Sequence, residues 1–128
     1  MPETEKLTIN LTPVDLGRIE VLVEQGFYAN RAEFIRTAIG RQLEKHADTV
    51  REASVRQGLV IGAMTFGRAD LERRRKSGKK LALKVIGYLS IADDVSAALA
   101  SQTIESLTVR GVFRAPAEVK AALSERMR

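Results

Sequence analysis

The sequence contains no cysteine, no tryptophan and a single histidine, His46. The lack of cysteine excludes disulfide bonds, a catalytic thiolate, and zinc or iron–sulfur sites with cysteine ligands. A Ser–His–Asp triad would have to use His46, which stands in a predicted helix far from any candidate nucleophile. We therefore expect no enzyme activity, no catalytic residues and no cofactor.

Long apolar runs are also absent. No apolar stretch approaches the roughly 20 residues that a membrane-spanning helix needs. The N-terminus is polar, and its first apolar residues alternate with polar ones, which is not the pattern of a signal peptide. The hydrophobic content of 45% is normal for a globular protein. These features predict a cytoplasmic protein of one domain or two small ones, with no membrane partner.

The net charge of +5 is unevenly distributed along the chain. Residues 1–50 carry six Lys/Arg and eight Asp/Glu, whereas residues 51–128 carry 15 Lys/Arg and eight Asp/Glu. Six of the basic residues fall between positions 73 and 80, namely Arg73, Arg74, Arg75, Lys76, Lys79 and Lys80. The basic character of the chain therefore belongs to its second half.

Polar and apolar residues alternate between Lys6 and Leu11, which predicts a short strand with one apolar face. No second strand is predicted nearby, and a lone strand cannot satisfy its own backbone N–H and C=O groups. The simplest partner is the same strand of a second chain, paired antiparallel about a two-fold axis. Such a two-stranded ribbon has dimensions that fit the major groove of DNA.

Two helices with recognisable starting signals follow the predicted strand. Thr12 suits the N-cap of the first helix, Pro13 its first position and Asp15 a capping box. Gly26 is expected to end this helix in a left-handed conformation. Asn30 is expected to cap a second helix, which runs to about His46 and which the pattern allows to continue through residue 57.

A strand, a capped helix, a glycine turn and a second capped helix resemble the ribbon-helix-helix repressors of the CopG-like group. The resemblance covers residues 5–46 and rests on the segments KLTINL, LTPVDL and GFYANRAEFIR and on the apolar stripe of the second helix. It implies an intertwined homodimer that inserts its ribbon into double-stranded DNA. The base-contacting positions of the family correspond to Lys6, Thr8 and Asn10, and its phosphate-contacting positions to Ala29, Asn30 and Arg31.

The chemistry of these residues agrees with those roles. Lys can donate to guanine, Asn can pair with adenine through two hydrogen bonds, and Thr can contact a thymine methyl group. The N-terminus of a helix presents free N–H groups and a positive dipole end to a phosphate. The alternative is that residues 6, 8 and 10 form only the solvated face of a dimer strand.

An internal repeat occupies the second half of the chain. Residues 83–99 and 107–123 align at an offset of 24 with seven identities in 17 positions, and an earlier copy begins near Val60 at an offset of 25. Each unit reads as a short apolar strand with a central glycine, a turn and a short helix, the helices being expected at 69–76, 94–100 and 116–127. Strands connected by a crossing helix run parallel.

These patterns predict an α+β protein in three parts. Residues 1–46 form the ribbon-helix-helix domain, 47–57 a helical linker, and 58–128 a domain of about three strand–helix repeats. That last domain resembles, weakly, a small parallel solenoid of the leucine-rich type, whose ends the first helix or a partner chain should cap. The alternative is an ordinary small α+β domain whose repeat records duplication only.

The acidic and basic clusters each have two explanations. Asp93 and Asp94 could hold a hard cation, but paired acids at a helix start are more often dipole partners. Nickel-responsive repressors also join a ribbon-helix-helix to a regulatory domain, but their metal site needs several His and a Cys, so no metal is expected here. The basic residues 73–80 are either a solvated helix end or a secondary contact to DNA or to an acidic partner protein.

The sequence as a whole predicts a sequence-specific DNA-binding transcriptional regulator, most simply a repressor, acting as a homodimer or higher homo-oligomer. Residues 58–128 would mediate assembly or bind a partner or effector. Two alternatives remain. One is the antitoxin of a toxin–antitoxin pair that represses its own operon and binds the toxin through its C-terminal part. The other is a scaffold protein that self-assembles through its repeats.

Overall fold

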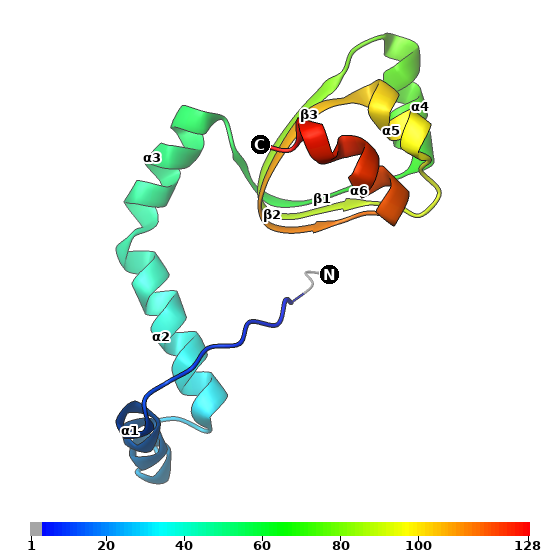
Figure 1. The fold of residues 1–128 in the computed structure, drawn as a ribbon. Coiled ribbons are helices and arrows are strands. Elements are labelled where there is room, and N and C mark those ends of the chain that lie inside the picture. The colour runs from blue at the N-terminus through cyan, green and yellow to red at the C-terminus, as the bar shows by residue number, and fades with distance from the viewer. Residues whose placement is uncertain (1–3) are drawn as a thin grey trace. The chain divides into compact units, whose positions relative to one another are not determined.

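The computed structural model of the protein describes residues 4–128, which form two compact units (Figure 1). The N-terminal unit comprises Lys6–Ala53, and the C-terminal unit comprises Ser54–Arg128 together with residues 4 and 5. None of the helices in the described chain is long and apolar enough to cross a membrane.

The N-terminal unit contains α1 (Pro13–Glu24), α2 (Arg31–Lys45) and most of α3 (Ala47–Gln57). The predicted start of α1 is confirmed, because Thr12 is the N-cap and its hydroxyl accepts a hydrogen bond from the Asp15 N–H at 3.1 Å. Gly26 has a φ of 83°, the left-handed conformation that its position after α1 predicted. The second helix ends at its C-cap His46, after which α3 begins at once.

Residues 4–12 form neither a helix nor a strand within the described chain. A strand needs a hydrogen-bonding partner, and the partner predicted for residues 6–11 is the same segment of a second chain. Because the structure is that of a single chain, the ribbon stays a prediction.

The C-terminal unit is a three-stranded parallel sheet whose strand order follows the sequence. Its strands are β1 (Val60–Phe66), β2 (Leu81–Ile91) and β3 (Ile104–Arg114), and they pair as β1-β2-β3. The parallel direction is the one that the sequence predicted. The strands bend around α4 (Arg68–Ser77), α5 (Ala97–Thr103) and α6 (Ala117–Leu123), which lie on the concave side of the sheet (Figure 1). A short 3-10 helix, η1 (Ser124–Arg126), follows α6.

The register of the sheet brings together residues that are equivalent in the aligned sequence segments. Gly62 pairs with Gly87, and Gly87 with Gly111, as the offsets of 25 and 24 align them. The pair Leu83–Leu107 follows the same offset of 24. The interpretation of these units as solenoid repeats stays a prediction.

The helices of this unit lie near their expected positions, with one clear difference. A helix expected at 94–100 begins instead at Ala97, with Ser96 as its N-cap, and continues directly into β3. Asp94 lies in the preceding turn, where its carboxylate accepts a hydrogen bond from the Arg68 N–H at 3.1 Å. Asp94 therefore stabilises the N-terminus of α4, where Arg68 lies 26 positions earlier in the sequence. It does not cap the helix that follows it.

The hydrophobic core lies between the sheet and its helices. Inward-facing residues alternate along β2 on both sides of Gly87, with Leu83 and Val85 before it and Leu89 and Ile91 after it. The helices contribute Leu71, Leu99, Val119 and Leu123, all of which are buried. The C-terminal unit therefore has a core of its own.

A column of glycines crosses the three strands at their bend. A Cβ atom at Gly87 would collide with the carbonyl oxygen of Gly62, and one at Gly111 would collide with the carbonyl oxygen of Gly87. Both residues also have a positive φ, 134° and 129°, which a residue with a Cβ adopts only under strain. The close approach of adjacent strands at the bend therefore depends on glycine.

We predict that Gly111→Ala lowers the free energy of unfolding of the C-terminal unit by about 3 kcal/mol, because overpacking and backbone strain both contribute. Urea unfolding of the full chain measures this change. Gly67→Ser is the matched control, since a Cβ at Gly67 meets only ordinary contacts at 3.7 Å or more and serine is a good N-cap for α4. Equal stability of Gly111→Ala and the wild-type protein would contradict the role of the glycine column.

Candidate nucleic-acid interface

The predicted base-contacting residues Lys6, Thr8 and Asn10 are all exposed. The apolar residues between them are exposed as well, with Leu7 81%, Ile9 54% and Leu11 41% accessible to solvent. An alternating segment with both faces in water lacks the packing that would fix which face points outward. A second chain is what would bury the apolar face and leave the polar one free.

The helices of the N-terminal unit also leave most of their apolar side chains exposed to solvent. Within residues 6–53, Ile19 is the one buried apolar side chain among the described residues. The apolar side chains that remain exposed in this unit also include Val14, Val21, Phe27, Ile39 and Leu43. Monomeric soluble proteins rarely leave so many apolar side chains of one small unit in water.

At the start of α2, predicted to bind phosphate, two backbone N–H groups already have side-chain acceptors. The Asn30 side chain accepts a hydrogen bond from the Glu33 N–H at 2.8 Å, and the Glu33 carboxylate accepts one from the Ala29 N–H at 2.6 Å. Of the donors predicted to meet phosphate, the Ala29 N–H is thus already bonded to an anion.

Arg31 has an acidic neighbour too. Its guanidinium lies 3.6 Å from the Glu20 carboxylate of α1, and both side chains are more than half exposed. Glu20, Glu24, Ala29, Asn30 and Arg31 line a shallow hollow of about 360 Å³ between α1 and the start of α2. A phosphate entering this hollow meets the dipole of α2 and Arg31 favourably and the carboxylates of Glu20 and Glu33 unfavourably.

A comparison with known protein families matches residues 2–120 to the Ribbon-Helix-Helix transcriptional regulator family. The chain belongs to this family. The match includes both units of the structure, so the membership is not limited to residues 5–46, where the sequence resembles the CopG-like repressors. No curated protein and no solved structure shows significant similarity to the chain.

Membership in this family makes the chain a DNA-binding transcriptional regulator in the broad sense. The residues that contact DNA are a finer question, which the family match does not address. Within residues 4–128, no group of three or more His, Cys, Asp or Glu side chains is arranged to hold a metal ion. His46 is exposed at the end of α2, with its Nε2 3.4 Å from the Gln42 amide nitrogen.

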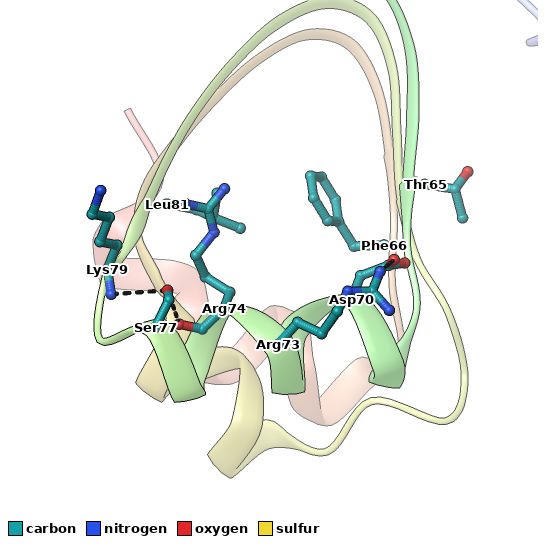
Figure 2. A pocket seen from close by; sticks show the side chains of 8 residues that line it. All are labelled: Thr65, Phe66, Asp70, Arg73, Arg74, Ser77, Lys79 and Leu81. Atoms are coloured by element: carbon teal, nitrogen blue, oxygen red, sulfur yellow. Dashed lines mark hydrogen bonds and ion pairs between the residues drawn. The ribbon is translucent and has the colours of Figure 1, made fainter.

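The basic residues of positions 73–80 point in different directions. Arg73 donates to the Asp70 carboxylate at 2.6 Å, and Arg75 lies 4.0 Å from the Glu72 carboxylate. Arg74 projects under the bent strands, toward the same hollow as Phe66 (Figure 2). Lys76 and Lys80 are exposed and do not line that hollow. The six cations therefore do not form one continuous surface.

From the sequence, Asn30 was expected to cap α2, and the competition of the Glu33 carboxylate with phosphate was missed. The spacing of Asn30 and Glu33 carried that signal, because a carboxylate three residues after the N-cap can reach back to a backbone N–H at the helix start. Glu20 gave no such signal, since its position beside Arg31 depends on the packing of α1 against α2.

We predict that Glu33→Gln strengthens DNA binding about fivefold at low salt, because the amide keeps the capping bond and removes a charge near the phosphate. Fluorescence anisotropy with a duplex oligonucleotide measures the change. Glu44→Gln is the matched control, since it removes the same charge near the other end of α2, well beyond the screening length of about 10 Å. An affinity unchanged by Glu33→Gln would show that the start of α2 lies away from the DNA backbone.

Proposed function

We propose that the protein is a homodimeric, sequence-specific repressor that reads the DNA major groove with a ribbon formed by residues 6–11 of two chains. The side chains of Lys6, Thr8 and Asn10 from both chains face the bases. The backbone and side chains of Ala29, Asn30 and Arg31 contact phosphates on either side.

The exposure of Leu7, Ile9 and Leu11 is the observation that carries this proposal. These residues alternate with polar ones, and a single chain gives them nothing to pack against. Pairing two such segments antiparallel satisfies their backbone groups and buries the apolar face on the helices of both chains. The same pairing directs the polar side chains outward, where they can reach base edges.

The C-terminal unit favours a regulator over an antitoxin. Its buried core is formed by residues of β2, β3 and three helices, with Met64 and Phe66 of β1 packed against it. This core supports a unit that folds without a partner. A tail that folds only on a toxin would have few buried apolar residues of its own. We assign this unit to assembly or to the binding of a partner.

The dimer should be obligate. Ile9→Lys places a charge in the apolar face of the ribbon, so we expect dimerisation and folding of the N-terminal unit to be lost together. Analytical ultracentrifugation and circular dichroism measure the two effects. Ile61→Lys, a substitution of an exposed isoleucine in β1, should leave the dimer intact. A well-folded wild-type monomer at micromolar concentration would refute the proposal.

Base reading is tested by substituting the ribbon side chains. Thr8→Ala or Asn10→Ala should weaken binding to the selected operator by roughly 1–3 kcal/mol, with little change in non-specific affinity. Sites selected from random DNA by the wild-type protein and by a triple alanine variant at Lys6, Thr8 and Asn10 show which bases are read. Thr4→Ala, outside the ribbon, is the control. Identical selected sites for the triple variant would mean that the ribbon does not read sequence.

A further inference from the structure

The outer edge of β1 is open and carries none of the features that protect an edge strand. Within residues 4–128, β1 pairs only with β2. Its sequence, VIGAMTF, contains no charged residue and no proline. Proteins usually protect exposed edges with charges, proline or a covering segment, because an unprotected edge can pair with another chain.

Inward-facing positions of β1 are open as well. Val60 is 60% exposed, whereas Val85, its partner in the register of the sheet, is 1% exposed. Phe66 is partly buried, whereas its partner Ile91 is 2% exposed. The inward-facing side chains are therefore covered in β2. Nothing in the C-terminal unit covers the equivalent side chains of β1 to the same extent.

A hollow of about 570 Å³ adjoins this edge. Its apolar lining comes from Phe66 and Leu81, and its cations come from Arg73, Arg74 and Lys79 (Figure 2). Arg73 already pairs with Asp70. Arg74 is partly buried and, within the described chain, has no carboxylate partner for its guanidinium, and the ammonium group of Lys79 has none either. A partly buried cation without a counterion is an attractive site for an acidic group.

A second copy of this chain is a poor occupant for this site. The outer edge of β3, which could continue the sheet, is paired at Leu107 with Met127, and the Arg128 N–H donates to the Leu107 carbonyl at 2.8 Å. Part of the edge that a second copy would have to offer is therefore already paired, which favours a separate extended segment as the occupant of the β1 edge.

We propose that the β1 edge and the adjoining hollow bind an extended segment of a partner protein whose hollow-facing residues, at every second position, include both apolar and acidic side chains. The segment adds a strand to β1, places apolar side chains over Val60 and Phe66, and places carboxylates against Arg74 and Lys79. Backbone hydrogen bonds supply affinity in this mode of recognition, and the side-chain contacts supply specificity. The proposal goes beyond DNA recognition and does not depend on it.

The test begins with a display library of random peptides of the same length as β1, seven residues, selected on the full-length protein without DNA. We expect enrichment of Asp or Glu together with apolar residues at every second position, the positions that share one face of the added strand. The synthesised consensus peptide should bind the Arg74→Gln/Lys79→Gln variant roughly tenfold more weakly than the wild-type protein. Lys76→Gln/Lys80→Gln removes the same charge outside the hollow and should leave the affinity within about twofold. Circular dichroism should show that both double variants remain folded, because none of the substituted residues belongs to the buried core.

A consensus peptide N-methylated at alternate residues separates strand addition from simple charge attraction. It cannot donate the backbone hydrogen bonds that a β1 partner needs, so we expect its binding to be lost. Equal binding of the methylated peptide, equal losses in the two double variants, or no acidic enrichment would overturn the proposal. Displacement of the peptide by inorganic phosphate alone would mark a general anion site and overturn it too. If Arg74→Gln/Lys79→Gln instead flattens the salt dependence of DNA binding by about 0.9 in log–log slope per charge, the hollow contacts DNA and not a protein segment.

Discussion

The apolar side chains of residues 6–53 have too little surface within one chain to pack against. Two helices, most of a third and the seven residues before them do not enclose a core. Ile19 alone among the described apolar residues of this unit is buried. The proposed function follows from that deficit. A partner that covers Leu7, Ile9 and Leu11 orders the backbone between them, and this ordering is what presents Thr8 and Asn10 in a fixed geometry. Under the proposed function, recognition of DNA and association of the chains are one event.

The C-terminal unit solves the same problem within a single chain. Its parallel strands pair in sequence order, and each strand carries a helix that covers its concave face. The unit therefore has a core, but a stack of few layers has two ends that its interior does not cover. Residues 127 and 128 pair with the β3 side at Leu107, whereas β1 has no equivalent pairing on its outer edge within the described chain. The asymmetry of the two ends is the basis for placing a partner at β1.

Local signals in the sequence were sufficient for the starts of α1 and α2. Thr12, Asn30 and Gly26 act through neighbours within four residues, so their roles can be read from spacing alone. The sequence predicted the parallel direction of the strands, and the observed register pairs Gly62, Gly87 and Gly111 at the same offsets as the aligned repeats. Features that depend on contacts between distant segments could not be predicted. Asp94 was assigned to the helix after it, but it bonds the Arg68 N–H of α4. The six cations of positions 73–80 looked like one patch, but α4 turns them toward different neighbours.

The glycine column also has a genetic consequence. Any nucleotide change that replaces the glycine at position 87 or 111 with another amino acid adds at least a Cβ atom, because glycine is the smallest amino acid. Every amino-acid change at either codon therefore costs stability, whereas exposed neighbours such as Ala82 and Lys84 can vary without a clash between the strands. Selection on this half of the gene should be concentrated at two codons 24 positions apart, so that these glycines persist after the remaining identity between the strand segments has been lost.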